Sequence, residues 1–165
     1  MNPLILMAGI VLVPTILIML ARTKAALIFM ALCVGAVLSN YVGDTALDMV
    51  QMFVRSYDQT TASIVQIGLL LFPVLLTLLF LSRTLSKSKL FMNLLPALLT
   101  GIAVLFLVVP LLPPGTSGSI YATDVWNQLS AYQAALLSAA ALLSLAQLWA
   151  TGHSNRIKDK SKKKH

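Results

Sequence analysis

The sequence predicts an all-α integral membrane protein with five transmembrane helices. Of its 165 residues, 58% are hydrophobic and 10% are charged, and the mean hydropathy is +0.88. A soluble domain carries roughly 25% charged residues, so this chain has too few polar groups to cover a surface exposed to water. Its long apolar segments and the positions of its basic residues then predict how many times it crosses a bilayer and in which direction.

Five apolar segments are each close to the roughly 20 residues that a helix needs to cross a bilayer. The first has no Lys or Arg before it and no small-residue cleavage site after it, so we interpret it as a span and not as a signal peptide. Together the segments predict a single bundle over residues 1–150, with spans at about 3–21, 25–43, 62–81, 90–112 and 125–150.

The fifth segment is the least apolar, because Asn and Gln side chains flank its centre. Trp126 and Trp149 are 23 residues apart, or roughly 34 Å along a straight helix. That separation fits two aromatic anchors at opposite membrane interfaces. We therefore expect this segment to cross the bilayer.

The basic residues predict the orientation. With five spans, 11 of the 12 Lys and Arg residues share one face, whereas Asp44, Asp48, Asp58 and Asp124 lie on the other. Basic residues near span ends mark the cytoplasmic side, so the N-terminus is expected outside and the C-terminus inside. Four spans would place the basic C-terminal segment outside and break this pattern.

Residues 151–165 end in NRIKDKSKKKH and are expected to form a basic cytoplasmic tail. Basic side chains close to a membrane attract anionic headgroups, at roughly 1 kcal/mol per residue. No specific nucleic-acid partner is expected, because the tail has no aromatic or Gly residues interleaved for base stacking. The expected contacts with anionic lipid come from Arg156, Lys158, Lys160, Lys162, Lys163 and Lys164.

Residues 44–60 have the pattern of an amphipathic helix. At 100° per residue, Phe53 and Tyr57 fall on an apolar half and Asp44 and Arg55 on a polar half. Arg55 also lies three residues before Asp58, at a spacing that allows an ion pair. A helix of this kind suits the outer membrane interface. It would either cover the bundle or dock an external partner.

Small residues recur at spacings of four within three of the spans. Such stripes let helix backbones approach closely. They predict packing within one chain or an interface between copies. The predicted packing residues are Ala31, Gly35, Ser39 and Gly43 in the second span, Ala97 and Gly101 in the fourth, and Ser130, Ala134 and Ser138 in the fifth.

The spans contain no Asp, Glu, Lys, Arg or His in their interiors, which argues against ion-coupled transport, proton relays and voltage sensing. His153 and His165 lie in the tail and Cys33 is alone in an apolar run, so we predict no catalytic, cofactor-binding or metal-binding residues. We single out five polar residues within the spans. They would form interhelical hydrogen bonds or line a pore between copies: Asn40, Gln66, Thr77, Asn93 and Thr100.

Residues 1–112 hold an ordered set of features. An apolar first span is followed by a basic turn (ARTKAA), a Gly/Ala-rich second span (ALCVGAVLSNYVGD) and the amphipathic stretch. A third span, a second basic turn (SRTLSKSKL) and a span containing ALLTGIAVLFLVV come next. This order resembles the colicin V production protein family of small bacterial inner-membrane proteins. The resemblance implies an envelope-associated protein with no catalytic residues to carry over.

We therefore expect a non-enzymatic protein of the bacterial cytoplasmic (inner) membrane that acts as a scaffold, assembly factor or accessory subunit of a membrane complex. Its partners would be the lipid bilayer, anionic headgroups at the tail, and another membrane protein or a second copy of the chain. The alternative is a subunit of an oligomeric channel or transporter. A lipid-modifying or proteolytic enzyme is the third and weakest interpretation.

Overall fold

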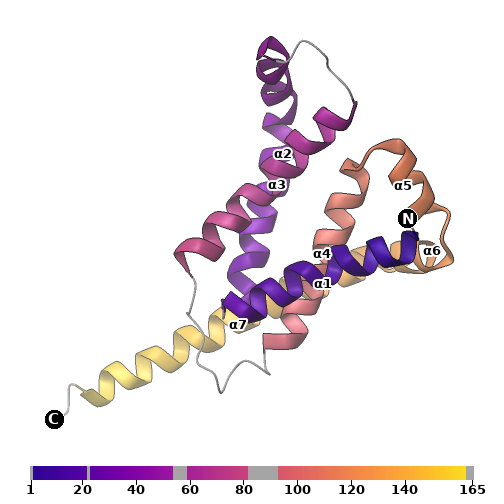
Figure 1. The fold of residues 1–165 in the computed structure, drawn as a ribbon. Coiled ribbons are helices and arrows are strands. Elements are labelled where there is room, and N and C mark those ends of the chain that lie inside the picture. The colour runs from indigo at the N-terminus through magenta and orange to yellow at the C-terminus, as the bar shows by residue number, and fades with distance from the viewer. Residues whose placement is uncertain (1, 22, 54–58, 82–92, 163–165) are drawn as a thin grey trace.

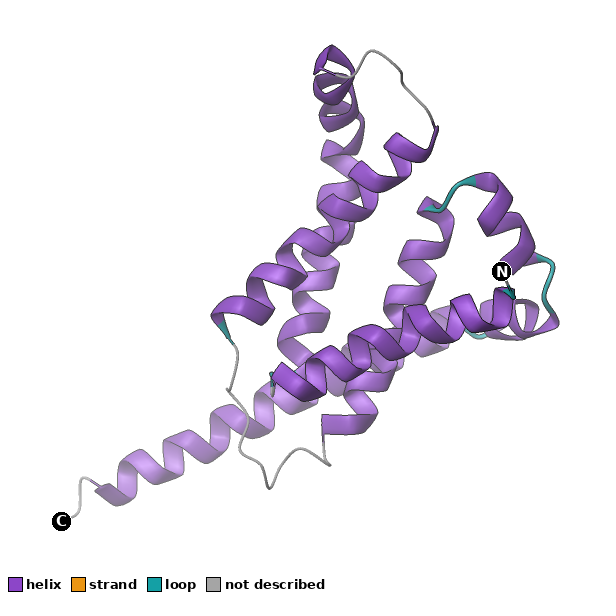
Figure 2. Cartoon of the chain, viewed as in Figure 1, coloured by secondary structure: helices purple, strands orange, loops and turns teal. Residues whose placement is uncertain are grey.

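The structure, a computed structural model, describes residues 2–21, 23–53, 59–81 and 93–162 (Figure 1). Among these residues the regular structure is helical throughout (Figure 2), which confirms the predicted all-α class. The elements are α1 (Pro3–Ala21), α2 (Ala25–Phe53), α3 (Gln59–Phe80), α4 (Leu94–Val108), the 3-10 helix η3 (Val109–Leu111), α5 (Pro114–Tyr121), α6 (Asp124–Ala131) and α7 (Gln133–Lys162).

Within the described part of the chain, four helices are long and apolar enough to cross a membrane. They cover Pro3–Ala21, Ala25–Val50, Thr60–Phe80 and Leu94–Leu111. α6 and α7 make a fifth candidate if they count as one broken span, although they meet at a bend of 59°. The fold is therefore that of an integral membrane protein with four or five spans.

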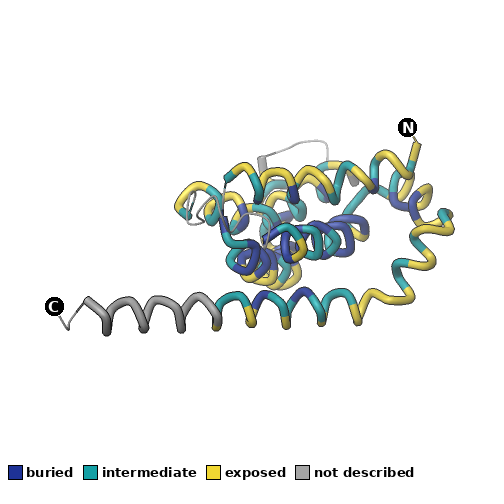
Figure 3. The backbone as a smooth tube through the Cα atoms, turned by 90° about the horizontal axis from the view of Figure 1, so that it is seen from below, coloured by how far each residue is buried: buried dark blue, intermediate teal, exposed yellow. Residues whose placement is uncertain are grey.

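α4 is the central helix of the bundle. It contacts α1, α2 and α7, and 56% of the residues in its span are buried, against 17% in α1 and α3. Viewed from below, buried positions gather on the central helices and exposed positions on the outer ones (Figure 3). The main core joins Ile18 of α1, Leu32 of α2, Leu70 of α3, Val104 of α4 and Ala140 of α7.

A second apolar cluster fixes the N-terminal end of α1. Met7 of α1 packs with Leu105 of α4, Val109 of η3 and Ile120 of α5, and Trp126 of α6 packs against this group. The N-terminus therefore lies at the same end of the bundle as α5 and α6 (Figure 1).

The separate interfacial helix predicted over 44–60 is wrong for residues 44–53, which continue α2 without a break. Gly43 does not end the helix. Gly43 is buried, and a Cβ atom at this position would lie at an ordinary contact distance of 3.8 Å from Gln66 of α3. Leu47, one turn further on, is buried, and packing there favours continuation.

The 29 residues of α2 extend over about 43 Å, which exceeds the roughly 30 Å of a hydrocarbon core. The end of α2 that carries Asp44 and Asp48 can therefore lie beyond the apolar layer. Tyr57 and the predicted pair of Arg55 and Asp58 lie outside the described residues. For Phe53 the structure describes the helical backbone.

The fifth predicted span is not one continuous helix, because the chain bends at Tyr132 between α6 and α7. The ring of Trp126 lies between those of Phe106 and Tyr121, with centroids 5.8 and 5.3 Å away. This packing turns α6 towards the end of α4, whereas α7 follows the side of the bundle. The separation of roughly 34 Å between Trp126 and Trp149 that a straight helix would give therefore does not apply. Trp149 itself is 76% exposed.

Residues 114–121, which lie between the fourth and fifth predicted spans, form α5. Pro114 occupies the first position of the helix, where its missing N–H costs nothing. The hydroxyl of Ser117 donates to the carbonyl of Pro113 at 3.3 Å, and Ile120 is fully buried. The burial of one apolar residue thus holds a short helix whose glycines alone would favour a loop.

At the other end of the chain, α7 continues through residues 151–162, so the helix does not stop where the tail was predicted to begin. For Arg156, Lys158, Lys160 and Lys162 the structure describes the helical backbone, and Lys163 and Lys164 lie outside the described residues.

Candidate functional site

The small residues of α2 face α3. A Cβ atom added at Gly35 would overlap the backbone carbonyl of Leu70, whose carbonyl carbon would be 2.9 Å away. One turn further on, the hydroxyl of Ser39 donates to the carbonyl of Gln66 at 3.2 Å. Ala31 and Ser39 are buried. Within the predicted stripe Ala31–Gly35–Ser39–Gly43, Gly35 and Ser39 thus form a close contact between two helices of the same chain.

The small residues of α4 face α1. A Cβ atom at Gly101 would lie 2.5 Å from the Thr15 hydroxyl oxygen and 2.6 Å from the carbonyl oxygen of Val11. The Thr15 hydroxyl donates within its own helix to Val11 at 2.7 Å and lies 3.4 Å from the carbonyl oxygen of Ala97. Ala97 and Gly101 therefore let the two backbones meet around Thr15.

The predicted stripe of the fifth segment needs a correction. Ala134 and Ser138 are exposed, and the hydroxyls of Ser130 and Ser138 donate to carbonyls one turn back, at 3.1 and 2.7 Å. Among residues 133–149 of α7, whose side chains the structure describes, the buried positions are instead Ala140 and Ser144. Small residues occur on several sides of this Ala-rich helix, so their spacing alone does not identify the packed face.

Asn93 is 1% exposed and joins three segments of the chain. Its side-chain Nδ2 donates to the carbonyl of Thr23 at 2.9 Å. Its Oδ1 accepts from the backbone N–H of Ala25 at 3.1 Å and from Nε2 of Gln147 at 2.9 Å. We call Thr23, Ala25, Asn93 and Gln147 the polar junction. It satisfies a backbone N–H at the start of α2 that has no partner within the helix.

The residues of the polar junction adjoin, in the sequence, the three segments that carry most of the basic residues. Thr23 lies in the turn between Arg22 and Lys24, Asn93 follows the segment containing Arg83, Lys87 and Lys89, and Gln147 precedes the tail. α4 leaves the junction towards α5 and α6, and α7 returns to it from that far end (Figure 1).

A polar pocket of about 210 Å³ lies between α2, α3 and the end of α4. Its polar lining comes from Ser39, Asn40, Asp44 and Gln66. It thus brings together Asn40 and Gln66, two of the five polar residues singled out in the sequence. The hydroxyls of Thr77 and Thr100 instead donate to carbonyls of their own helices at 2.7 and 2.8 Å.

The polar pocket offers one carboxylate, two amides and a hydroxyl, which can hydrogen-bond a small polar group or water. Within the described residues, no three His, Cys, Asp or Glu side chains are close enough to hold a metal ion. The arrangement is therefore suited to hydrogen-bonding a small polar group.

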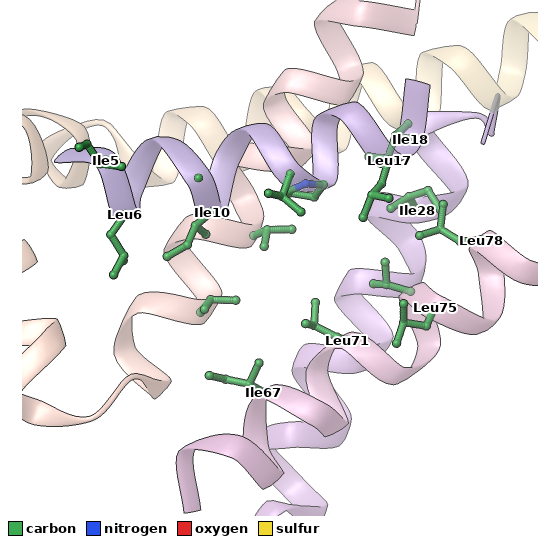
Figure 4. Close-up of a pocket in the computed structure, with 16 residues that line it drawn as sticks. Ile5, Leu6, Ile10, Leu17, Ile18, Ile28, Ile67, Leu71, Leu75 and Leu78 are labelled. Carbon is green, nitrogen blue, oxygen red and sulfur yellow. The ribbon is translucent and has the colours of Figure 1, made fainter. Parts of the chain in front are cut away.

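A larger pocket of about 580 Å³ lies between α1 and α3, with α4 behind it, and we call it the apolar groove. Side chains of α1, among them Leu6 and Ile10, face Ile67 and Leu71 of α3 across it (Figure 4). All sixteen residues that line the groove are apolar. The hydropathy of the sequence did not predict the apolar groove, because the groove depends on how the α1/α4 and α2/α3 helix pairs diverge.

No family model, curated protein sequence or solved structure matches the chain. The resemblance to the colicin V production protein family therefore stays a prediction.

Proposed function

We propose that this chain is a non-enzymatic membrane protein that serves as a scaffold, assembly factor or accessory subunit of a membrane complex. The proposal rests on one observation: polar side chains within the spans make their hydrogen bonds inside the bundle. Asn93, Thr77 and Thr100 bond to groups of the same chain, and the apolar groove presents no chemistry. These polar groups stabilise the bundle and leave its outer faces for apolar partners.

We further propose five crossings with the N-terminus outside and the C-terminus inside, in the cytoplasmic membrane of a bacterium. The polar junction supports this topology, because Thr23, Asn93 and Gln147 meet there and each precedes or follows one of the three basic segments in the sequence. α6 and α7 would then cross together as one broken span. The tail would contact anionic headgroups on the inner surface.

The partner would be another membrane protein or a second copy of this chain. Outside the contacts with the bundle, α7 exposes Leu142, Leu145 and Trp149. Apolar faces of this kind suit helix packing within a bilayer, where shape complementarity supplies most of the affinity.

The second candidate, a subunit of an oligomeric channel or transporter, is favoured by the polar pocket. One polar side chain per copy can line a pore when several copies surround an axis. Asn40 and Asp44 are exposed and line that pocket, so they are the residues that such a ring would use.

Purification in a mild detergent, followed by reconstitution into liposomes, tests these two proposals together. We expect one partner, or a second copy, to co-purify in fixed proportion and the liposomes to conduct no ions. Asn40→Leu and Gln66→Leu should leave partner binding largely intact, because neither side chain is expected to contact the partner. Conductance that either substitution alters would reject the scaffold in favour of the channel.

A further inference from the structure

We infer that the apolar groove between α1 and α3 binds one acyl chain of a bilayer phospholipid. This site goes beyond the proposed scaffold function and does not depend on it. The argument rests on the length and width of the groove, on its lining and on the side from which it opens.

The groove is long and narrow. On α1 its lining runs from Ile5 to Ile18, or about 20 Å at 1.5 Å per residue. On α3 it runs from Ile67 to Leu78, or about 17 Å. Its volume of about 580 Å³ is well below the roughly 1,600 Å³ that a helix about 10 Å across fills over 20 Å of length. A partner helix therefore does not fit inside, but a single hydrocarbon chain does.

The length also fits a lipid. Half of a hydrocarbon core is about 15 Å deep, so a groove of about 20 Å is long enough to cover a chain from one leaflet along its whole length. Val104 and Val108 of α4 form the back wall and are buried. Along the opposite side, Val13, Leu17 and Leu75 line the groove and are exposed, so a chain can enter sideways from the surrounding bilayer.

The lining excludes other occupants of similar width. A polar ligand would lose its hydrogen bonds to water without replacement, because all sixteen lining residues are apolar and burying an unpaired polar group is unfavourable. An acyl chain has no hydrogen bonds to lose on burial, and it gains dispersion contacts along both walls of the groove. A chain held there would fill the space between the α1/α4 and α2/α3 pairs and keep them apart.

Photolabelling tests the site. The full-length protein is reconstituted in phosphatidylcholine vesicles that contain a trace of phosphatidylcholine with a mid-chain diazirine, and adducts are mapped by peptide mass spectrometry. We expect adducts to concentrate on Leu71 and Val74 in the groove, above the level at the outward-facing Leu12 and Ile16. An even distribution over all exposed apolar residues would overturn the inference.

Two glycines provide a matched pair of variants. Gly9 lines the groove whereas Gly68 does not, and a Cβ atom at either position meets nothing within 4 Å. Gly9→Phe should fill the groove and lower labelling of Leu71 to the level at Leu12, while Gly68→Phe leaves it unchanged. Labelling of Leu71 that persists in a folded Gly9→Phe protein, or groove residues crosslinked to a protein instead of lipid, would reject the acyl chain as occupant.

Discussion

Replacing Gly35 by alanine lowers the thermal stability of the protein in detergent, whereas the same replacement at Gly68 leaves it unchanged or raises it. Both residues lie inside long helices, where alanine is intrinsically favoured over glycine by up to about 1 kcal/mol. At Gly35 the added Cβ atom meets the backbone of Leu70, and backbone cannot move aside as a flexible side chain can. Overpacking of this kind costs about 1–3 kcal/mol, so the two variants should differ in sign.

Gly43→Ala provides an intermediate case, because its Cβ atom would lie at an ordinary contact distance of 3.8 Å from the Gln66 side chain. We expect little change there. The melting temperatures of Gly35→Ala, Gly43→Ala and Gly68→Ala in one detergent test this order of stabilities. If Gly35→Ala and Gly68→Ala shifted the melting temperature equally, the packing of α2 against α3 through Gly35 would be wrong.

Replacing Asn93 by leucine is expected to loosen the bundle at the polar junction. The two side chains have the same number of heavy atoms and the same branching at Cγ, but the variant leaves the N–H of Ala25, the carbonyl of Thr23 and the Nε2 of Gln147 without this partner. A buried polar group that loses its partner costs about 1–3 kcal/mol, although hydrogen bonds between membrane helices average nearer 0.6 kcal/mol. We therefore expect a loss of about 2–5 kcal/mol for the three groups together, and earlier release of α7 on heating.

Thr100→Val is the control for that experiment. Thr100 is also buried, but its hydroxyl donates to Pro96 of its own helix, so its removal should cost less than about 1 kcal/mol. Proteolysis of α7 at rising temperature, with melting followed in parallel, measures both variants. Equal and small effects of the two substitutions would show that Asn93 does not hold the three segments together.

The fold class and the positions of the first four helices could be predicted from the sequence, because long apolar runs have few other stable arrangements. The prediction failed where packing decided the outcome. α2 passes Gly43 because Gln66 packs there, and α5 forms because Ile120 is buried. No Pro or Gly near Tyr132 indicates in the sequence that the chain bends there. The bend follows from Trp126 packing on Phe106 and Tyr121.

Site residues could be predicted where the signal lies in the residue type or in a short spacing along the sequence. The spacing of Gly35 and Gly101 indicated close helix contacts, and Asn93 was identified as a polar residue within a span. Its three partners could not be predicted, because they come from segments 68–70 and 54 residues away in the chain. The apolar groove has no sequence signal, since its lining is composed of the same residues that face lipid elsewhere.

Cysteine labelling in intact cells tests the central claim, a five-span bundle with its three basic segments on the cytoplasmic face. In a Cys33→Ala background, single cysteines at Ser119, Ser86 and Ser161 are exposed to a reagent that does not cross the membrane. Ser119, which is exposed in α5, should be labelled from outside, whereas Ser86 and Ser161 should react after the membrane is permeabilised. Labelling of Ser161 from outside in intact cells would contradict this topology.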